Sequence, residues 1–236
     1  MRIEKITSPF LEENAYVISA EGSSEALIID PGVSTHDRIA QYLDSESLHA
    51  TTVLLTHGHA DHIWDSAAFS LPVRIAKPDL YRLENPLAQL PFPLAGNALW
   101  NKPEDIQFHS SSTEYYADGL PILMIPAPGH TEGSVVLLTE IPAGDRLIAN
   151  FAIAGNTGET LTESRPLALT GDVIFAGSVG RTDLPGGDEV QMRHTLRTLS
   201  NALDPRTWML PGHGPATVWN NEIENNPYII RAQRVG

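Results

Sequence analysis

The sequence predicts a single α+β domain in which helices cover a strand-rich core. Short apolar runs recur along the chain between turn residues, which is typical of strands. Two longer segments carry apolar residues at helical spacing instead. The length of 236 residues suits one large domain, and no repeat, low-complexity tract or linker divides it. Residues 1–236 are therefore expected to form one domain.

Each expected strand is a short apolar run bounded by turn residues. These runs are 15–20, 26–29, 52–55, 73–76, 122–125, 135–138, 167–170 and 208–210. The expected helices are one that Ser34 or Thr35 caps and that ends near Asp44, one over 188–203, and a short one over 221–225. Segments 85–118 and 140–166 lack periodicity, which predicts a long loop region and a polar insertion.

The charge and the residue usage exclude several classes of protein. With 15 basic and 29 acidic residues, the net charge is −14, which opposes binding to nucleic acids and to anionic membranes. The absence of Cys excludes thiolate metal ligands, a Cys nucleophile and disulfides. No signal-like apolar core and no long apolar run occur, so a cytoplasmic protein is expected. The oligomeric state stays open.

The segment T-H-G-H-A-D-H at 56–62 follows an expected strand and holds four potential metal ligands. His57 and His59 are two residues apart, so on extended backbone their side chains point the same way. Asp61 and His62 are adjacent, so a turn can direct them to a neighbouring position. Imidazole nitrogens and carboxylate oxygens suit zinc, iron or manganese. So dense a set favours a metal site over a solvated turn.

Three more polar residues follow expected strands and turns. They are His130 in P-A-P-G-H-T-E-G-S, Asp172 in L-T-G-D-V-I-F and His213 in L-P-G-H-G-P. Each is weak evidence alone, but five His and two Asp complete the ligand sets of two ions. The first ion would take His57, His59 and His130, and the second would take Asp61, His62 and His213. Asp172 would bridge them, because a carboxylate has two oxygens.

These motifs, together with G-R-T-D at 180–183, resemble those of the metallo-β-lactamase-fold hydrolases, and most closely those of the glyoxalase II-like (hydroxyacylglutathione hydrolase) branch. The resemblance runs from about residue 2 to 228 and implies an αββα sandwich with two divalent ions, zinc by preference, at one edge. Only 23 residues follow His213, so the helical C-terminal domain of full-length glyoxalase II is not expected. Segments 85–118 and 140–166 also look longer than is usual in this family.

The expected activity is hydrolysis of a small-molecule thioester of the S-(2-hydroxyacyl) type, such as S-lactoylglutathione, by a metal-bridging hydroxide. A thioester is favoured because a thiolate leaves without much acid assistance. Asp61 would ligate one ion and orient the hydroxide. Asp30 is expected to accept a hydrogen bond from a ligating His ring, or to be only a turn residue. Arg181 would clamp a substrate carboxylate, or pair with Asp183 or Asp188.

Two other activities stay open at this point. A persulfide dioxygenase, which is an oxidoreductase of the same superfamily, would use one iron on His57, His130 and Asp172. A lactonase would use the same seven ligands as the thioesterase. Thiolate-ligated β-lactamases are excluded because the chain has no Cys. A nuclease is opposed by the net charge, and a binding module without activity is opposed by the full ligand set.

Overall fold

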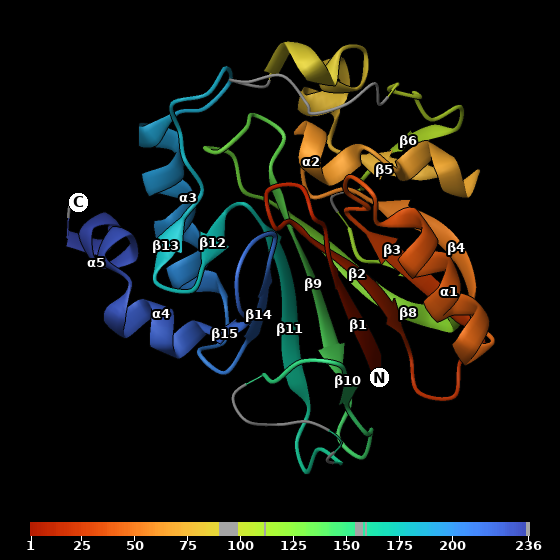
Figure 1. The fold of residues 1–236 in the computed structure, drawn as a ribbon. Helices are drawn as coiled ribbons and strands as arrows, with labels where there is room; N and C mark the ends of the chain where they lie inside the picture. The colour runs from red at the N-terminus through yellow and green to blue at the C-terminus, as the bar shows by residue number, and fades with distance from the viewer. Residues whose placement is uncertain (90–98, 111, 154–157, 159, 235–236) are drawn as a thin grey trace.

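Two β-sheets lie face to face, and helices cover the outer face of each (Figure 1). The computed structural model describes residues 1–89, 99–110, 112–153, 158 and 160–234. Within them the first sheet consists, in spatial order, of β10 (Ile148–Ala149), β1 (Arg2–Thr7), β2 (Asn14–Ser19), β3 (Glu25–Ile29), β4 (His49–Leu54), β5 (Val73–Ile75) and β6 (Ile106–Phe108). The second consists of β15 (Thr217–Val218), β14 (Trp208–Pro211), β11 (Arg165–Gly171), β9 (Val135–Ile141), β8 (Leu120–Pro126) and β7 (Glu114–Tyr116).

The remaining elements complete the four layers. They are the helices α1 (His36–Glu46), α2 (Ala60–Ile63), α3 (Glu189–Ala202), α4 (Trp219–Asn225) and α5 (Pro227–Arg234), the 3-10 helices η1 (Ser66–Phe69), η2 (Lys77–Leu83), η3 (Pro86–Gln89) and η4 (Ala117–Gly119), and the hairpin β12 (Ile174–Phe175) and β13 (Ser178–Val179). Helix α1 flanks the first sheet, and α3, α4 and α5 flank the second (Figure 1). The αββα order implied by the resemblance is thereby confirmed.

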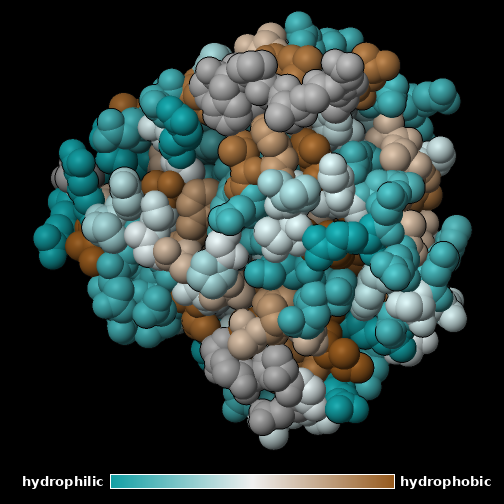
Figure 2. Space-filling view, viewed as in Figure 1, coloured by the Kyte–Doolittle hydropathy of each residue, from teal (hydrophilic) through white to brown (hydrophobic). Residues whose placement is uncertain are grey.

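Alternation along the strands sorts apolar side chains into three cores. In β2, Tyr16 and Ile18 face the other sheet, whereas Val17 between them packs with Ile39 of α1. This is the two-residue period of a strand that is buried on both faces. A third core joins the second sheet to α3 and α5. The exposed face in Figure 2 is mostly hydrophilic and shows apolar residues only in small groups.

The structure corrects two sequence-based expectations about loops. Segment 85–118 is not a continuous loop, because it contains η3, β6, β7 and part of η4. Segment 140–166 likewise contains the end of β9, all of β10 and the start of β11. Strands β6, β7 and β10 lie at sheet edges and are two or three residues long, too short to show a periodic pattern. Residues 90–98, 111, 154–157 and 159 of these segments lie outside the described residues.

The start of α1 also differs from the expected cap. Thr35 occupies the N-cap position, but its hydroxyl donates to the carbonyl oxygen of Gly32 instead of capping the helix. The carboxylate of Asp65 takes over, accepting hydrogen bonds from the backbone N–H groups of Thr35 at 2.8 Å and His36 at 2.9 Å. The cap therefore comes from a residue 30 positions away, which ties α1 to the turn after α2.

Strand β1 and helix α5 were not predicted. In β1 only Ile3 and Ile6 are buried, and the charged residues between them hide the pattern. Helix α5 buries Ile229 and Ala232 against α3.

Among the described residues, no helix is both long enough and apolar enough to cross a lipid bilayer.

The long-range cap leads to a stability prediction. Asp65→Ala should lower the free energy of unfolding by about 1 kcal/mol, because the first N–H groups of α1 lose their acceptor. Urea denaturation followed by circular dichroism measures this. Asp44→Ala, an exposed acidic residue of the same helix, serves as the control. Equal stability of the two variants would show that the Asp65 contact stabilises nothing.

Candidate metal centre

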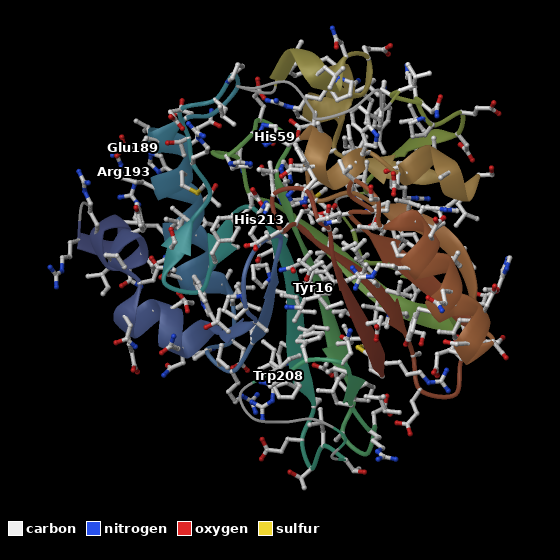
Figure 3. The ribbon with its side chains drawn as sticks, in the orientation of Figure 1. Tyr16, His59, Glu189, Arg193, Trp208 and His213 are labelled. Atoms are coloured by element: carbon white, nitrogen blue, oxygen red, sulfur yellow. The ribbon has the colours of Figure 1, made fainter. Side chains whose placement is uncertain are left out.

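All seven predicted ligands lie at one edge of the sandwich, and they come from both sheets. The turn after β4 and the short helix α2 carry His57, His59, Asp61 and His62. The second sheet supplies His130 between β8 and β9, Asp172 directly after β11, and His213 after β14. In Figure 3, His59 and His213 lie at the same end of the strands, whereas Trp208 marks the opposite end.

The ligand atoms fall into two groups joined by one carboxylate. Potential ligand atoms of His57, His59 and His130 lie within 4.8 Å of one another, and those of Asp61, His62 and His213 form a second such group. Asp172 reaches both groups. Its Oδ1 is 3.2 Å from Nε2 of His62, and its Oδ2 is 3.5 Å from Nε2 of His130 and of His213.

The protein holds four of the histidine rings by Nδ1 and so directs Nε2 into the site. Nδ1 of His130 lies 2.7 Å from the carbonyl oxygen of Arg181, and Nδ1 of His213 lies 3.0 Å from that of Leu11. A carbonyl oxygen can only accept, so each Nδ1 donates, and in the neutral ring Nε2 keeps a lone pair. This is the arrangement that metal-binding histidines use in proteins.

Asp30 orients the other two rings and therefore serves both groups. Its Oδ2 lies 3.0 Å from Nδ1 of His62 and also accepts a hydrogen bond from the Thr56 hydroxyl. The Thr56 oxygen in turn lies 3.1 Å from Nδ1 of His57. The backbone N–H of Thr56 donates to the Asp30 Oδ1 at 2.7 Å, which fixes the carboxylate.

Burial and charge set the protonation of the first group. Burial and, after it, the neighbouring histidines lower the pKa of His57 well below its usual value and that of His59 to about 3. Both rings are therefore neutral at physiological pH, which is the form that binds a metal.

The second group combines ionised carboxylates with basic rings. Burial opposes ionisation of Asp61 and Asp172, but the nearby histidines, His62 first and His213 after it, together lower the pKa of both carboxyls. Burial also opposes protonation of His62, yet Asp172 and Asp61 raise the pKa of that ring well above its usual value. The two carboxylates thus attract a proton to the His62 ring. A metal ion at this position would displace that proton.

The donor atoms fit a pair of divalent metal ions. Within the described residues, Nε2 of His57, His59, His62 and His130 and Oδ1 of Asp172 are buried and have no hydrogen-bond partner. Buried polar atoms without a partner are costly, so a cluster of five needs an explanation. Nitrogen and carboxylate oxygen donors at this spacing suit zinc or iron.

The backbone comes unusually close to the site beside His213. A Cβ atom at Gly212 would lie 2.4 Å from Oδ1 of Asp172 and 2.5 Å from Cε1 of His62. Only glycine fits such a space, which gives the Gly in P-G-H-G-P a physical reason.

Arg181 lies beside the centre, where its backbone carbonyl contacts His130 and its side chain forms an ion pair. Its guanidinium donates to both carboxylate oxygens of Asp183, at 2.7 and 2.8 Å, and the side chain is 54% exposed. The ion pair that the sequence left open is therefore present. The clamp on a substrate carboxylate stays a prediction.

Sequence reasoning missed Glu13 and Thr56. Glu13 is completely buried, and its carboxyl oxygens have no hydrogen-bond partner among the described residues. Burial raises the pKa of this carboxyl well above its usual value, and the nearby Asp30 and Asp61 raise it further. The only signal for it was an acidic pair directly before the apolar strand β2.

The shared role of Asp30 predicts an effect on both ions. Asp30→Asn should weaken metal binding by roughly 10- to 100-fold, because an amide has one acceptor oxygen and cannot accept all three hydrogen bonds from the Thr56 N–H, the Thr56 hydroxyl and His62. Asparagine tolerates the φ of +47° at this position. Competition with a chromophoric chelator measures both affinities, with Asp37→Asn on the exposed face of α1 as the control. Unchanged affinity for both ions would refute the role.

Comparison with known proteins agrees with this geometry. The chain is 28% identical to the hydroxyacylglutathione hydrolase GloC of Haemophilus influenzae, over 97% of this chain and 98% of that protein. It is similar to the BLEG-1 B3 metallo-beta-lactamase structure, with 26% identity, a TM-score of 0.72 and coverage of 96% and 99% of the two chains. It is also similar to TTHA1623 in a di-iron-bound form, with 29% identity, a TM-score of 0.71 and coverage of 95% and 98%.

The model of the Metallo-beta-lactamase superfamily matches residues 9–142, more than half of the chain. This range includes the H-x-H-x-D-H segment and His130. With the two facing sheets and the buried His and Asp clusters already described, the match identifies the chain as a member of the metallo-β-lactamase superfamily.

Proposed function

We propose that this metal-dependent hydrolase is a binuclear thioester hydrolase of the glyoxalase II type. The observation that carries the proposal is the pair of buried donor groups joined by Asp172. The name of the relative GloC supports a thiol ester of a hydroxy acid as the substrate. The di-iron form of TTHA1623 supports iron beside zinc as the metal.

In the proposed site, His57, His59 and His130 would hold one ion, and Asp61, His62 and His213 the other, with Asp172 between them. When bound, two such cations would lower the pKa of a water molecule and polarise the substrate carbonyl. Asp61 is ionised and buried, so its carboxylate can accept a hydrogen bond from the attacking water and fix its direction. A thiolate is a good leaving group and needs no proton donor. A thioester therefore suits this site, whose carboxylates and neutral imidazoles accept protons or bind metal.

A cavity near the centre offers a place for the thiol half of the substrate. It has a volume of about 280 Å3 and lies between α3, α5 and the turn after β13. Met192 and Leu196 give it apolar walls. Arg181 forms part of the rim, and its carbonyl oxygen contacts His130.

The charge at this cavity favours an anionic ligand. Arg193 on the rim already pairs with Glu189 at 2.7 Å, and both side chains lie on α3 (Figure 3). Arg231 also lines the cavity and has no acidic partner among the described residues. In a chain of net charge −14, an available guanidinium beside apolar walls suits the carboxylate of a small thiol such as glutathione.

The central test is thiol release from a panel of thioesters. The protein has no Cys, so a thiol reagent detects only the product. We expect release from S-lactoylglutathione or a similar 2-hydroxyacyl thioester, loss of release with a chelator, and about two metal ions per chain. Asp172→Asn should bind metal poorly and lose nearly all activity, because the carboxylate that joins the two groups is gone.

Other outcomes of the panel would replace the proposal. Oxygen consumption on a glutathione persulfide with one iron per chain would establish the dioxygenase reaction. Opening of a lactone or of a β-lactam, without thioester cleavage, would establish a hydrolase of another substrate class.

The cavity leads to a prediction on substrate affinity. Arg231→Gln should raise the KM for a glutathione thioester about tenfold and leave kcat unchanged, because a charge-assisted contact far from the reacting bond is lost. Arg234→Gln on the same helix is the matched control. A thioester of an uncharged thiol should show no difference between wild type and Arg231→Gln. Equal KM values for the charged substrate would exclude the cavity as the thiol site.

A further inference from the structure

We propose that Asp79 is a positioning residue that holds together the two turns carrying His57, His59 and His130. The inference rests on the metal centre proposed above. These turns belong to different sheets, since one follows β4 and the other connects β8 to β9. The first group of ligands therefore forms only if something fixes the distance between the turns.

The carboxylate of Asp79 makes hydrogen bonds to both turns. Its Oδ2 accepts from the backbone N–H of Gly58 at 2.8 Å, between His57 and His59. The same oxygen accepts from the hydroxyl of Thr131 at 2.7 Å, and Oδ1 accepts from the backbone N–H of Gly133 at 2.8 Å. One side chain in η2 thus satisfies donors that flank all three histidines.

Helix η2 packs so closely against both turns that neither Gly58 nor Gly133 has space for a side chain. A Cβ atom at Gly133 would lie 2.6 Å from Cγ of Asp79, and one at Gly58 would lie 2.8 Å from Cδ of Arg82. Both glycines belong to the motifs H-G-H and H-T-E-G-S, yet neither residue can ligate a metal. The approach of η2 gives a reason for both.

An arginine offsets the cost of burying this carboxylate. Asp79 and Arg82 are both completely buried, and Nε of Arg82 lies 3.3 Å from Oδ1 of Asp79. Nη2 of Arg82 donates to Glu132 at 2.7 Å and to the carbonyl oxygen of Pro185 at 2.9 Å. The ion pair thereby extends to the segment whose Arg181 carbonyl holds His130.

The second ligand group is held by a different device. The side-chain amide of Asn14 donates to the carbonyl oxygens of Pro211 and Gly214, at 3.1 and 2.9 Å, and so holds the turn of His213. The Tyr16 hydroxyl also donates to Pro211, at 2.8 Å. No contact of Asp79 with the second group occurs in the part of the chain that the structure describes. Loss of Asp79 should therefore affect one ion more than the other.

The test is a zinc titration of Asp79→Asn that resolves two dissociation constants. The amide keeps the size of the side chain but cannot accept all three hydrogen bonds, so one constant should weaken roughly 10- to 100-fold. Anomalous scattering from crystals at limiting zinc should show lower occupancy at the site of His57, His59 and His130. Asn14→Ala should shift the loss to the site of His213. Glu84→Gln, at the exposed end of η2, is the control and should leave both constants unchanged.

The outcomes separate this inference from the proposed function. If wild type does not bind two ions, the binuclear centre itself is wrong. If wild type binds two and Asp79→Asn keeps both constants within about twofold, or weakens them equally, the positioning role is wrong. Should Asp79→Asn not fold, Thr131→Val removes one of the three hydrogen bonds and should weaken the same constant by a smaller factor.

Discussion

Neither group of candidate metal ligands is complete within one sheet, and the rest of the structure depends on this constraint. His57 and His59 follow a strand of the first sheet, but their partner His130 follows a strand of the second. The pair Asp61 and His62 needs His213 in the same way. The edge of the sandwich must therefore hold two layers in register to within the tolerance of a coordination bond.

Hydrogen bonds between the two sheets hold them in register at this edge, and metal binding would strengthen the contact between the sheets. The backbone N–H of Val135 donates to the carbonyl oxygen of Thr56 at 2.9 Å, and that of Asn14 donates to Gly212 at 2.7 Å. Bound ions would give partners to the buried imidazole nitrogens of His57, His59 and His130. Metal binding is thus coupled to the stability of the folded chain, since ligands that bind only the native state stabilise it.

The residues that come together at this edge could be predicted from the sequence because they are local signals at strand ends. The motif at 56–62 is dense, and His130, Asp172 and His213 each follow an apolar run and a turn. The residues that orient the ligands could not be predicted in the same way. Asp79 and Asn14 act on turns far away in the chain, and their own neighbourhoods resemble ordinary polar positions. The edge strands β6 and β7 were not predicted for a related reason. Backbone pairing with a neighbouring strand defines them, and their sequences carry no apolar pattern.

The two ends of the sandwich are fastened very differently. At the metal edge, Asn14, Tyr16 and Asp79 link residues from opposite layers. These hydrogen bonds are buried. At the other end β10 pairs with two residues of β1 (Figure 1), and the hydrogen bonds that Asn150 adds to Glu4 and Lys5 are exposed to solvent. Local opening should therefore begin at that far end and leave the metal edge closed. Thermal motion can then separate the two layers at the far end while the distances between the two groups of His and Asp side chains at the metal edge stay fixed.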